Sequence, residues 1–461
     1  MLNRGLNTKT EPPKSNDKEY KGVVSDLKDA LASGVKQVDE ILSTKHEKIG
    51  TPESMNLLEE FFSVIPSGAY RDSLNTKDKN QNKTEKKETD LTLRTMADSY
   101  LEIHLNFKDD LELLKQYENA WGEIKVGKVM EDLDKLAAGI GYKYCNEKVA
   151  SSHLTIVTAS VDRIAIHKRI NPEKNYRLGG HVSYVGYSSM EIFIKMEEID
   201  PNKIGTNEAI TLSNSPAILE AKFTMVARDK YTKRASQLHP LLVRGDREKK
   251  LFNDGLASKA RKMATVQKSL TKAPPTAEER LLVHDLYLES LKYLDETSPM
   301  PSNVKWMSST QLQSVTVCQP QDRNVHNFIF GGYLMRLAFQ LAWVTGYNYI
   351  GTVPRFLASD EILFRKSVPI GSILTLTSKV AHTPEKHDGS SSIEDSLLQV
   401  SVQARVISPD RTDNGITNTF HFTFQTPDSD QFPVPRVLPK SYAECMEYLE
   451  ARRKRLTVDN S

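Results

Sequence analysis

The sequence predicts an α+β fold in which a buried helix followed by extended strands occurs twice. A polar segment runs into Gly331 and Gly332, and the apolar pattern that follows has helical spacing, which predicts a central helix beginning at the glycines. From Gly351 the chain continues with two β-type runs, the first ending at Asp360 and the second opening at Gly371. The same order of patterns stands earlier in the chain, and we interpret it as an internal duplication.

The first unit contains the elements that the second unit repeats. Residues 99–107 alternate between apolar and polar side chains, which is the pattern of a half-buried strand. A helical pattern covers 126–145, and strand patterns follow at 154–166, 181–199 and 217–228. Three stretches match between the units: TASVDRIAI with LASDEILF, YRLGGHVSY with VPIGSILTL, and AILEAKFTMVARD with TNTFHFTFQTPD.

These patterns divide the chain into five parts. A polar start and an amphipathic helical pattern over 21–42 form an N-terminal extension. Between the units, Thr276 and Glu279 have the spacing of a capping box, so we expect a helical linker that packs along the outside of the strands. A charged helical pattern over 441–455 ends the chain. The predicted parts are an extension (1–90), a first domain (91–230), a linker (231–305), a second domain (306–450) and a tail (451–461).

Composition and charge exclude several classes of function. The 62 Lys and Arg residues nearly balance the 60 Asp and Glu residues, so no strong attraction to nucleic acid or membranes is expected. Cys145, Cys318 and Cys445 stand far apart and form no metal-binding motif, which fits a reducing compartment. No apolar run approaches the length of a membrane-spanning helix. The N-terminus mixes acids with its basic residues and matches a mitochondrial transit peptide poorly.

Two motifs resemble those of a known enzyme family. From Asn324 the chain contains N-x(6)-G-G-x-L-M, and from Ser359 it contains S-D-x-I-x-F-x-x-x-V-x-x-G. Both are similar to motifs of the acyl-CoA thioesterases with the hotdog fold, in which an antiparallel sheet wraps around a central helix. Over about residues 90 to 450 the chain resembles the double-hotdog members, most closely the mitochondrial acyl-CoA thioesterase 9 group. The resemblance implies two tandem hotdog domains and hydrolysis of acyl-CoA.

The resemblance also implies a site shared between the two hotdogs. In this family one hotdog supplies a carboxylate from its central helix, and the other supplies an amide from the segment before its helix. Aligning the two helix starts puts the acid at Asp134 and the amide at Asn324. Asp134 is then expected to act as a general base or as a nucleophile, with Asn324 orienting the water or the carbonyl. Backbone N–H groups at the helix starts are expected to stabilise the oxyanion. The donors expected first are those at the start of the Asp134 helix, and the full set of residues is Val126, Gly127, Gly331 and Gly332.

A related second site would pair Asn119 with Phe339. Because phenylalanine cannot accept a proton, we predict that this second site is inactive. The two helix starts also differ, since the first unit has Val126 where the second has Gly331. The oxyanion geometry in the first unit is therefore expected to depart from the family pattern.

Each candidate has a purely structural alternative. Asp134 belongs to an acidic helix segment that the helix dipole favours, although Leu133 and Leu136 place it close to the apolar side. Asn324 has the alternative of capping its own loop as an Asx turn. Other polar and glycine residues are interpreted as structural or turn positions: Asp162, Asp360, His153, His326, Gly180 and Gly371.

Three functions compete. Acyl-CoA hydrolysis to free fatty acid and CoA is favoured, and it implies no cofactor, because CoA is part of the substrate and product. A non-catalytic acyl-CoA-binding protein is the main alternative, and a hotdog hydratase is the third. The resemblance further implies a mitochondrial location and a homotrimer of double hotdogs. Neither acyl chain length nor the residues that bind the CoA phosphates follow from the sequence.

Overall fold

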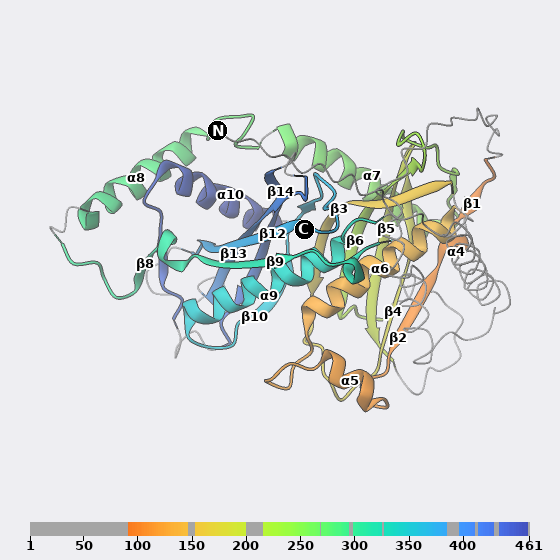
Figure 1. Ribbon diagram of the computed structural model, residues 1–461, viewed down its shortest axis with the longest axis horizontal. Helices are drawn as coiled ribbons and strands as arrows, with labels where there is room; N and C mark the ends of the chain where they lie inside the picture. The colour runs from red at the N-terminus through yellow and green to blue at the C-terminus, as the bar shows by residue number, and fades with distance from the viewer. Residues whose placement is uncertain are drawn as a thin grey trace, which may run out of the picture.

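A computed structural model describes residues 91–145, 153–199, 215–267, 269–294, 298–324, 327–384, 396–410, 414–427 and 433–459. The extension predicted over 1–90 lies outside these residues, as does the amphipathic helix predicted within it. His326 also lies outside them. Within the described part, the two halves of the chain stand side by side around a shared sheet (Figure 1).

The strands of both halves form one continuous antiparallel sheet. The halves join where β3 (Leu154–Ile166) pairs with β10 (Arg355–Ser359), through Ala165 opposite Ala358. β11 (Ile362–Leu363) adds a second short pairing with β3. In sheet order the strands on the first side of this junction are β2 (Leu101–Leu105), β4 (Tyr176–Val185), β5 (Ser189–Glu198) and β6 (Leu219–Asp229). Those on the second side are β14 (Asn414–Gln425), β13 (Leu397–Ile407), β12 (Ile373–His382) and β9 (Leu312–Val317).

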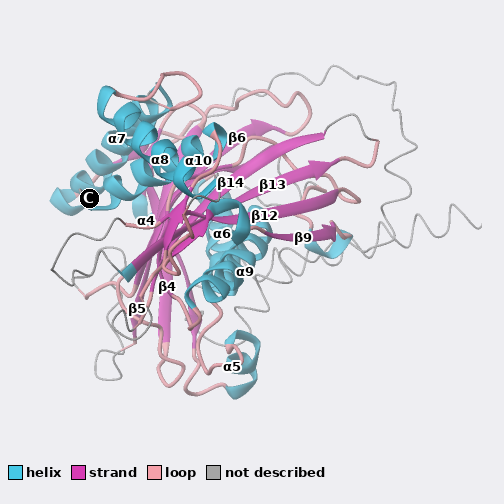
Figure 2. Ribbon diagram, turned by 90° about the vertical axis from the view of Figure 1, so that its left-hand side faces the viewer, coloured by secondary structure: helices cyan, strands magenta, loops and turns pink. Residues whose placement is uncertain are grey.

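Helices cover both faces of the sheet. α6 (Val126–Tyr144) and α9 (Gly331–Ile350) lie against each other on one face, whereas α7 (Gly245–Gln267) and α10 (Tyr442–Asp459) lie on the other (Figure 2). α8 (Ala277–Leu294) packs against α10. The short elements are β1 (Arg94–Thr95), α4 (Met96–Ser99), α5 (Leu111–Tyr117), β7 (Leu241–Leu242), β8 (Val304–Trp306), η4 (Met307–Thr310), η5 (Pro320–Asp322) and β15 (Arg436–Leu438).

Each half is an antiparallel sheet wrapped around one long helix. The apolar side of α6 is fully buried against the five strands β2 to β6, as the side chains of Val129, Leu133 and Ile140 show. α9 buries Leu334, Met335 and Ala338 against the strands of the second half in the same way. The predicted α+β fold of two tandem hotdog domains is therefore confirmed.

The strand pattern over 181–199 is wrong as a single strand. The chain there forms the end of β4 and the whole of β5, joined by a tight turn in which the Gly186 N–H donates to the Ser189 carbonyl at 2.7 Å. Val185 and Met190 stand opposite each other beside this turn. Because alternating side chains continue up to both ends of the turn, the period alone does not reveal it. The glycine at 186 is the local sign that the chain reverses.

The glycine at 180 and the glycine at 371 have the geometry expected of them. A Cβ atom at Gly180 would stand 2.6 Å from the Phe193 carbonyl and 2.9 Å from Ile140, so only glycine lets β4 approach β5 and α6 this closely. Gly371 has a φ of 80°, which turns the chain into β12.

The predicted capping box in the linker is confirmed. The Thr276 N–H donates to Glu279 at 2.8 Å, and the Glu279 N–H donates back to the Thr276 hydroxyl at 3.3 Å. The same Glu279 accepts two hydrogen bonds from Arg453 of α10, both at 2.6 Å. α8 is thus tied to α10, while α7 is the linker helix that packs on the strands, against β4.

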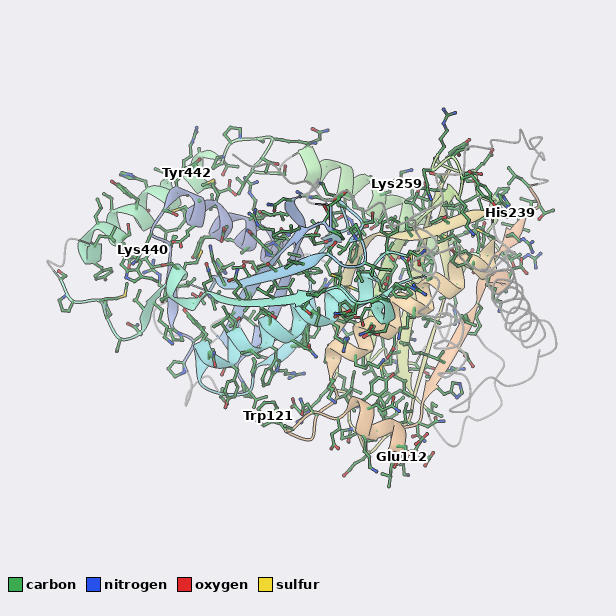
Figure 3. The ribbon with its side chains drawn as sticks, in the orientation of Figure 1. Glu112, Trp121, His239, Lys259, Lys440 and Tyr442 are labelled. Atoms are coloured by element: carbon green, nitrogen blue, oxygen red, sulfur yellow. The ribbon has the colours of Figure 1, made fainter. Side chains whose placement is uncertain are left out.

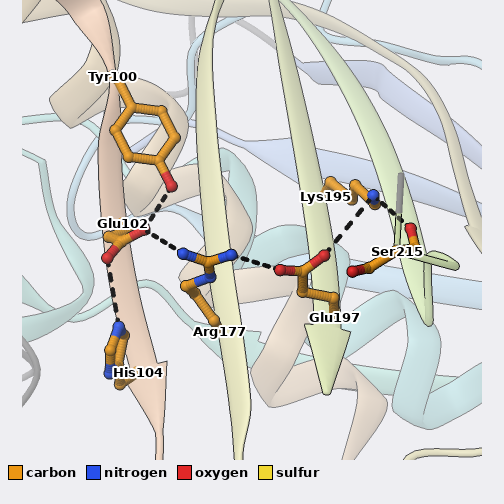
Figure 4. A network of polar contacts seen from close by, with 7 residues as sticks. All are labelled: Tyr100, Glu102, His104, Arg177, Lys195, Glu197 and Ser215. Carbon is orange, nitrogen blue, oxygen red and sulfur yellow. Dashed lines mark hydrogen bonds and ion pairs between the residues drawn. The ribbon is translucent and has the colours of Figure 1, made fainter. Parts of the chain in front are cut away.

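The outward side of the first half of the sheet carries a ladder of charges (Figure 4). Arg177 on β4 lies between Glu102 on β2 and Glu197 on β5, and Lys195 on β5 lies 3.7 Å from Glu197. Lys195 also donates to the Ser215 carbonyl at 2.6 Å. Since Lys195 and Glu197 are buried, these contacts offset the cost of removing their charges from water.

Candidate active site

Asp134 lies at the meeting point of the two halves. It stands in the middle of α6 with a side chain that is buried to 2% exposure. Its Oδ2 accepts a hydrogen bond of 2.7 Å from the backbone N–H of Gly332, in the first turn of α9. Its Oδ1 accepts one of 2.7 Å from the Thr158 hydroxyl on β3. The positive end of the α9 dipole therefore faces a carboxylate that belongs to the other half.

The two glycines at the start of α9 make this approach possible. A Cβ atom at Gly332 would stand 2.9 Å from both the Asp134 Cβ and the Glu131 Cα, which is too close for any other residue. One at Gly331 would stand 3.3 Å from Asp134 Oδ2 and 3.2 Å from the Phe364 ring. Among the described residues the Gly331 N–H has no hydrogen-bond acceptor. The start of α9 thus presents one donor to the carboxylate and leaves a second donor beside it.

Burial raises the pKa of Asp134 above its usual range. The hydrogen bonds from Thr158 and Gly332 act in the opposite direction, because they stabilise the ionised form. The negative charge of Glu131 raises the pKa further, while Lys135 lowers it. A carboxyl group with a raised pKa is a stronger base than an ordinary surface aspartate once it is ionised.

The start of α6 has surroundings that match those of the start of α9, and the residues of the two sets of surroundings correspond to one another at a constant difference in residue number. Gly127 packs against Phe339 and Arg336 of α9, just as Gly332 packs against Asp134 and Glu131 of α6. The two helices therefore run antiparallel, and the start of each meets the middle of the other. Phe339 takes the place of Asp134 and packs edge-on against Phe356 and Phe422, at centroid distances of 5.1 and 5.6 Å.

This arrangement corrects one expectation about the oxyanion donors. Val126 and Gly127 begin the Asp134 helix, but a helix rises 1.5 Å per residue, so its start lies roughly 12 Å from Asp134 along the axis. Gly127 instead lies beside Phe339, since a Cβ atom added to Gly127 would stand 3.3 Å from the Phe339 ring. The donors beside Asp134 are those of Gly331 and Gly332, from the partner helix. Antiparallel packing of the helices, which the sequence does not show, causes the exchange.

Asn324 lies in the loop that leads into α9. Its N–H donates to the Phe328 carbonyl at 2.7 Å, and its side-chain oxygen accepts from the Phe328 N–H at 3.2 Å. Asn119 occupies the matching loop before α6, where its N–H donates to the Glu123 carbonyl at 2.8 Å and its side-chain oxygen accepts from Glu123 at 3.0 Å. Both asparagines therefore cap their own loops, and Asn324 stands close along the chain to the glycines that face Asp134.

The two loops also share a left-handed residue. Gly122 has a φ of 72° in the first loop, and Asn327 has a φ of 62° at the matching position of the second. Trp121, which precedes Gly122 (Figure 3), packs on Trp343 of α9 with ring centroids 4.8 Å apart. Trp343 in turn stacks on Tyr347. An aromatic group thus adjoins the helix start that lacks an acid.

Thr158 is a site residue that sequence reasoning missed. Its hydroxyl holds Asp134 from a strand that follows the helix, so no spacing along the chain points to it. The comparison of the two units could have pointed to it, because aligning the stretches TASVDRIAI and LASDEILF matches Thr158 with Leu357. The positions of Asp134 and Thr158 are both apolar in the second unit.

The remaining acids of the two units have separate surroundings. Asp162 on β3 forms an ion pair with Lys262 of α7 and accepts a hydrogen bond of 3.1 Å from Ser258. Asp360 follows β10 and accepts from Gln399 at 3.0 Å, and its burial raises its pKa to about 6. Both stand with elements on the far face of the sheet from α6, which fits the structural interpretation.

The described residues contain no group of three or more His, Cys, Asp or Glu side chains placed to hold a metal ion. No helix within the same part of the chain is both long and apolar enough to span a membrane.

Several known proteins similar to this chain are mitochondrial acyl-CoA thioesterases. The mitochondrial acyl-coenzyme A thioesterase 9 of Bos taurus is 37% identical over 375 residues, which are 80% of this chain and 80% of that protein. The Homo sapiens protein of that name is 37% identical over 80% of this chain and 79% of its own length. The mitochondrial acyl-coenzyme A thioesterase 10 of Mus musculus is 36% identical over 78% of each chain. No protein-family model matches the chain.

Solved structures give weaker similarities. An acyl-CoA hydrolase from Staphylococcus aureus is 24% identical and covers 34% of this chain and 91% of its own, with a TM-score of 0.30. An acyl-ACP thioesterase from Bacteroides thetaiotaomicron is 10% identical over 72% of this chain and 99% of its own, with a TM-score of 0.39. TM-scores this low do not by themselves establish a shared fold.

Proposed function

The chain belongs to the family of acyl-CoA thioesterases 9 and 10, and we propose that it hydrolyses acyl-CoA to a free fatty acid and CoA. The observation that carries the proposal is the buried Asp134 carboxylate, which faces the bare N–H groups of a helix start from the other half. A binding protein needs no such carboxylate, and burying one is costly. None of the relatives supports the alternative of a non-catalytic binding protein.

Asp134 is the proposed general base. It accepts a proton from a water molecule while the water oxygen bonds to the thioester carbon. The carbonyl oxygen, which gains negative charge, is stabilised by the N–H groups at the start of α9, with Gly331 as the open donor. When the carbon–sulfur bond breaks, the proton held by Asp134 passes to the departing CoA sulfur. Water is the only other reactant, so we propose that the reaction needs no cofactor.

Asn324 is the proposed second catalytic residue. Its loop leads directly into the start of α9, and its side-chain oxygen is fixed by Phe328. A fixed amide in this position suits the task of orienting the water or the carbonyl. Only one such site is proposed per chain, because Phe339 replaces the acid at the other helix start. Val126 and Gly127 are therefore assigned to the inactive site.

The location follows from family membership, whereas the assembly is a proposal that rests on the family resemblance. We assign the chain to mitochondria, where its thioesterase 9 and 10 relatives are placed by their names. We also propose a homotrimer of double hotdogs. Sedimentation of the purified chain tests the trimer, and a monomer at micromolar concentration would contradict it.

Release of free CoA thiol from a series of saturated acyl-CoAs, from short to long, tests the function. The unmodified chain should release thiol from part of the series, which also gives the chain-length preference. Asp134→Asn should lower kcat by about 10²- to 10⁴-fold, since general-base catalysis contributes that much. Circular dichroism of the variant checks that it is folded.

Two outcomes would contradict the proposal. If the unmodified chain binds acyl-CoA and releases no thiol, it is a binding protein. If folded Asp134→Asn keeps its activity, the base lies elsewhere.

A further inference from the structure

Glu131 and Arg336 contact each other where α6 crosses α9. The Arg336 Nε lies 2.8 Å from a Glu131 carboxylate oxygen, and both side chains are partly buried, with exposures of 30% and 15%. These two residues also occupy matching positions of the two halves, at the same offset that relates Gly127 to Gly332. A pair of matching positions that touch each other lies on the approximate twofold axis between the halves.

The opposite charges of this pair require two different halves. In a dimer of identical halves, a residue on the axis meets its own copy, so Glu131 would face glutamate and Arg336 would face arginine. Two glutamates or two arginines in contact would repel each other. Glu131 and Arg336 attract each other, so this contact favours pairing of the first half with the second half over pairing of either half with its own copy. The negative member of the pair lies on α6, the helix of Asp134, and the positive member lies on α9, the helix whose start faces Asp134.

The charge of Glu131 also acts on Asp134. Glu131 precedes Asp134 by three residues, which places the two side chains on one face of α6. Its Cα would lie 2.9 Å from a Cβ on Gly332, so the backbone of Glu131 supports the glycine whose N–H holds Asp134. The negative charge of Glu131 is balanced by Lys135, at 3.1 Å, and by Arg336.

The charged groups around Asp134 come from two elements. α6 contributes Glu131 and Lys135, which act on Asp134 directly, and Lys128, which acts on Glu131 and is paired with Asp132 at 3.5 Å. α9 and the loop before it contribute Arg336, which lies 5.1 Å from the Tyr333 ring centre, and Asp322, which is hydrogen-bonded to Tyr333. Thr158 of β3 donates to Asp134, and Phe364, which follows β11, lies beside Gly331; neither residue carries a charge.

We propose that Arg336 is a positioning residue of the reaction, which holds Glu131 across the helix crossing and offsets the charge of Glu131 on Asp134. This inference rests on the proposed function, since it takes Asp134 to be the base. Without Arg336, Glu131 would retain only the lysines of its own helix, Lys128 and Lys135, and its charge would act more strongly on Asp134. Without Glu131, that repulsion would vanish.

The two single substitutions should therefore shift the pH dependence in opposite directions. A negative neighbour disfavours ionisation, so Arg336→Gln should raise the pKa of Asp134, and Glu131→Gln should lower it. Activity requires ionised Asp134 and is lost as the pH falls through this pKa. The acid limb of kcat/KM should accordingly move to higher pH in Arg336→Gln and to lower pH in Glu131→Gln, by roughly half a unit to one unit each.

Exchange of the two charges separates electrostatics from packing. The double variant Glu131→Arg with Arg336→Glu keeps an ion pair at the crossing but puts the positive charge beside Asp134. We expect a melting temperature within a few degrees of the unmodified chain and an acid limb shifted to lower pH by about one unit. Arg336→Lys, which retains the charge, should restore the limb and most of the activity lost in Arg336→Gln.

Two results would overturn the inference. One is an unshifted acid limb in the charge-exchanged variant. The other is a loss of kcat/KM of equal size in both single variants without any opposite shift, which a merely structural pair would give. Failure of the proposed function is distinguishable, because folded Asp134→Asn would then retain activity and its acid limb.

Discussion

The starts of α6 and α9 are the same structure with different chemistry. Each begins at a glycine pair or its counterpart, follows a loop capped by asparagine, and packs against the middle of the other helix. At the start of α9 the facing residue is Asp134, held by Thr158. At the start of α6 it is Phe339, among other phenylalanines. The difference teaches that the two halves share the backbone arrangement even where an apolar residue stands in place of the carboxylate.

The two sites also differ in what they contribute to stability. Burial of the Asp134 carboxylate costs free energy, which its two hydrogen bonds offset in part. Phe339 instead adds apolar and edge-on aromatic contacts that stabilise the crossing of the helices. On the proposed assignment, one helix start therefore carries the reacting carboxylate, while the other gains packing from the apolar residue at the matching position.

The largest difference between the helix starts should appear when each glycine gains a methyl group. In Gly332→Ala the new Cβ meets the Asp134 Cβ and the Glu131 Cα at 2.9 Å, so α9 must move away from α6. We expect thiol release to fall about 100-fold, because displacements near 1 Å cost that much. Overpacking should also lower the free energy of unfolding by about 1–3 kcal/mol.

Gly127→Ala is the matched control. There the new Cβ stands 3.3 Å from the Phe339 ring and 3.4 Å from Arg336, where side chains can adjust. Activity should remain within a few-fold of the unmodified chain, and the urea midpoint should change little. Equal losses of activity from both substitutions would show that the two helix starts are functionally equivalent.

The asparagine loops give the second comparison. Asn324→Ala removes the loop-capping hydrogen bond from Phe328, and Asn119→Ala removes those from Trp121 and Glu123, so each substitution should lower the free energy of unfolding by about 1 kcal/mol or more. Only Asn324→Ala should also lower kcat, by roughly 10-fold or more, because Asn324 lies beside the start of α9 that faces Asp134. Thermal melting and thiol release measure the two effects. A similar activity in both variants would leave Asn324 with its structural role alone.

The sequence predicted much of this arrangement and missed the part that depends on packing. The glycine pair follows from helical spacing, while the acid at 134 and the phenylalanine at 339 follow from the family resemblance together with the matching of the two units. The exchange of donors between the helices does not, because periodicity shows which face of a helix is buried and not in which direction its neighbour runs. For the same reason Thr158 was missed, and the turn at Gly186 stayed hidden within a continuous alternating pattern.

Thr158→Val tests the support of the active carboxylate with little change in volume. It removes the hydroxyl that donates to Asp134 Oδ1 at 2.7 Å and leaves the Gly332 N–H as the other donor. Since that hydrogen bond lowers the pKa of Asp134, its loss should raise the pKa. The acid limb of kcat/KM should move to higher pH, and kcat above the limb should fall by about 10-fold. An unshifted limb would mean that Thr158 does not act on the reacting carboxylate.

Phe339→Leu should have the smallest effect on activity. The substitution keeps an apolar side chain beside Gly127 and removes the ring contacts with Phe356 and Phe422. Loss of these contacts and of some volume should lower the free energy of unfolding by about 1–2 kcal/mol. Thiol release should stay within about two-fold, because no proton passes through this helix start. A fall in activity as large as that of Thr158→Val would instead mean that the second helix start takes part in turnover, through acyl-chain binding or through the helix crossing that it shares with Asp134.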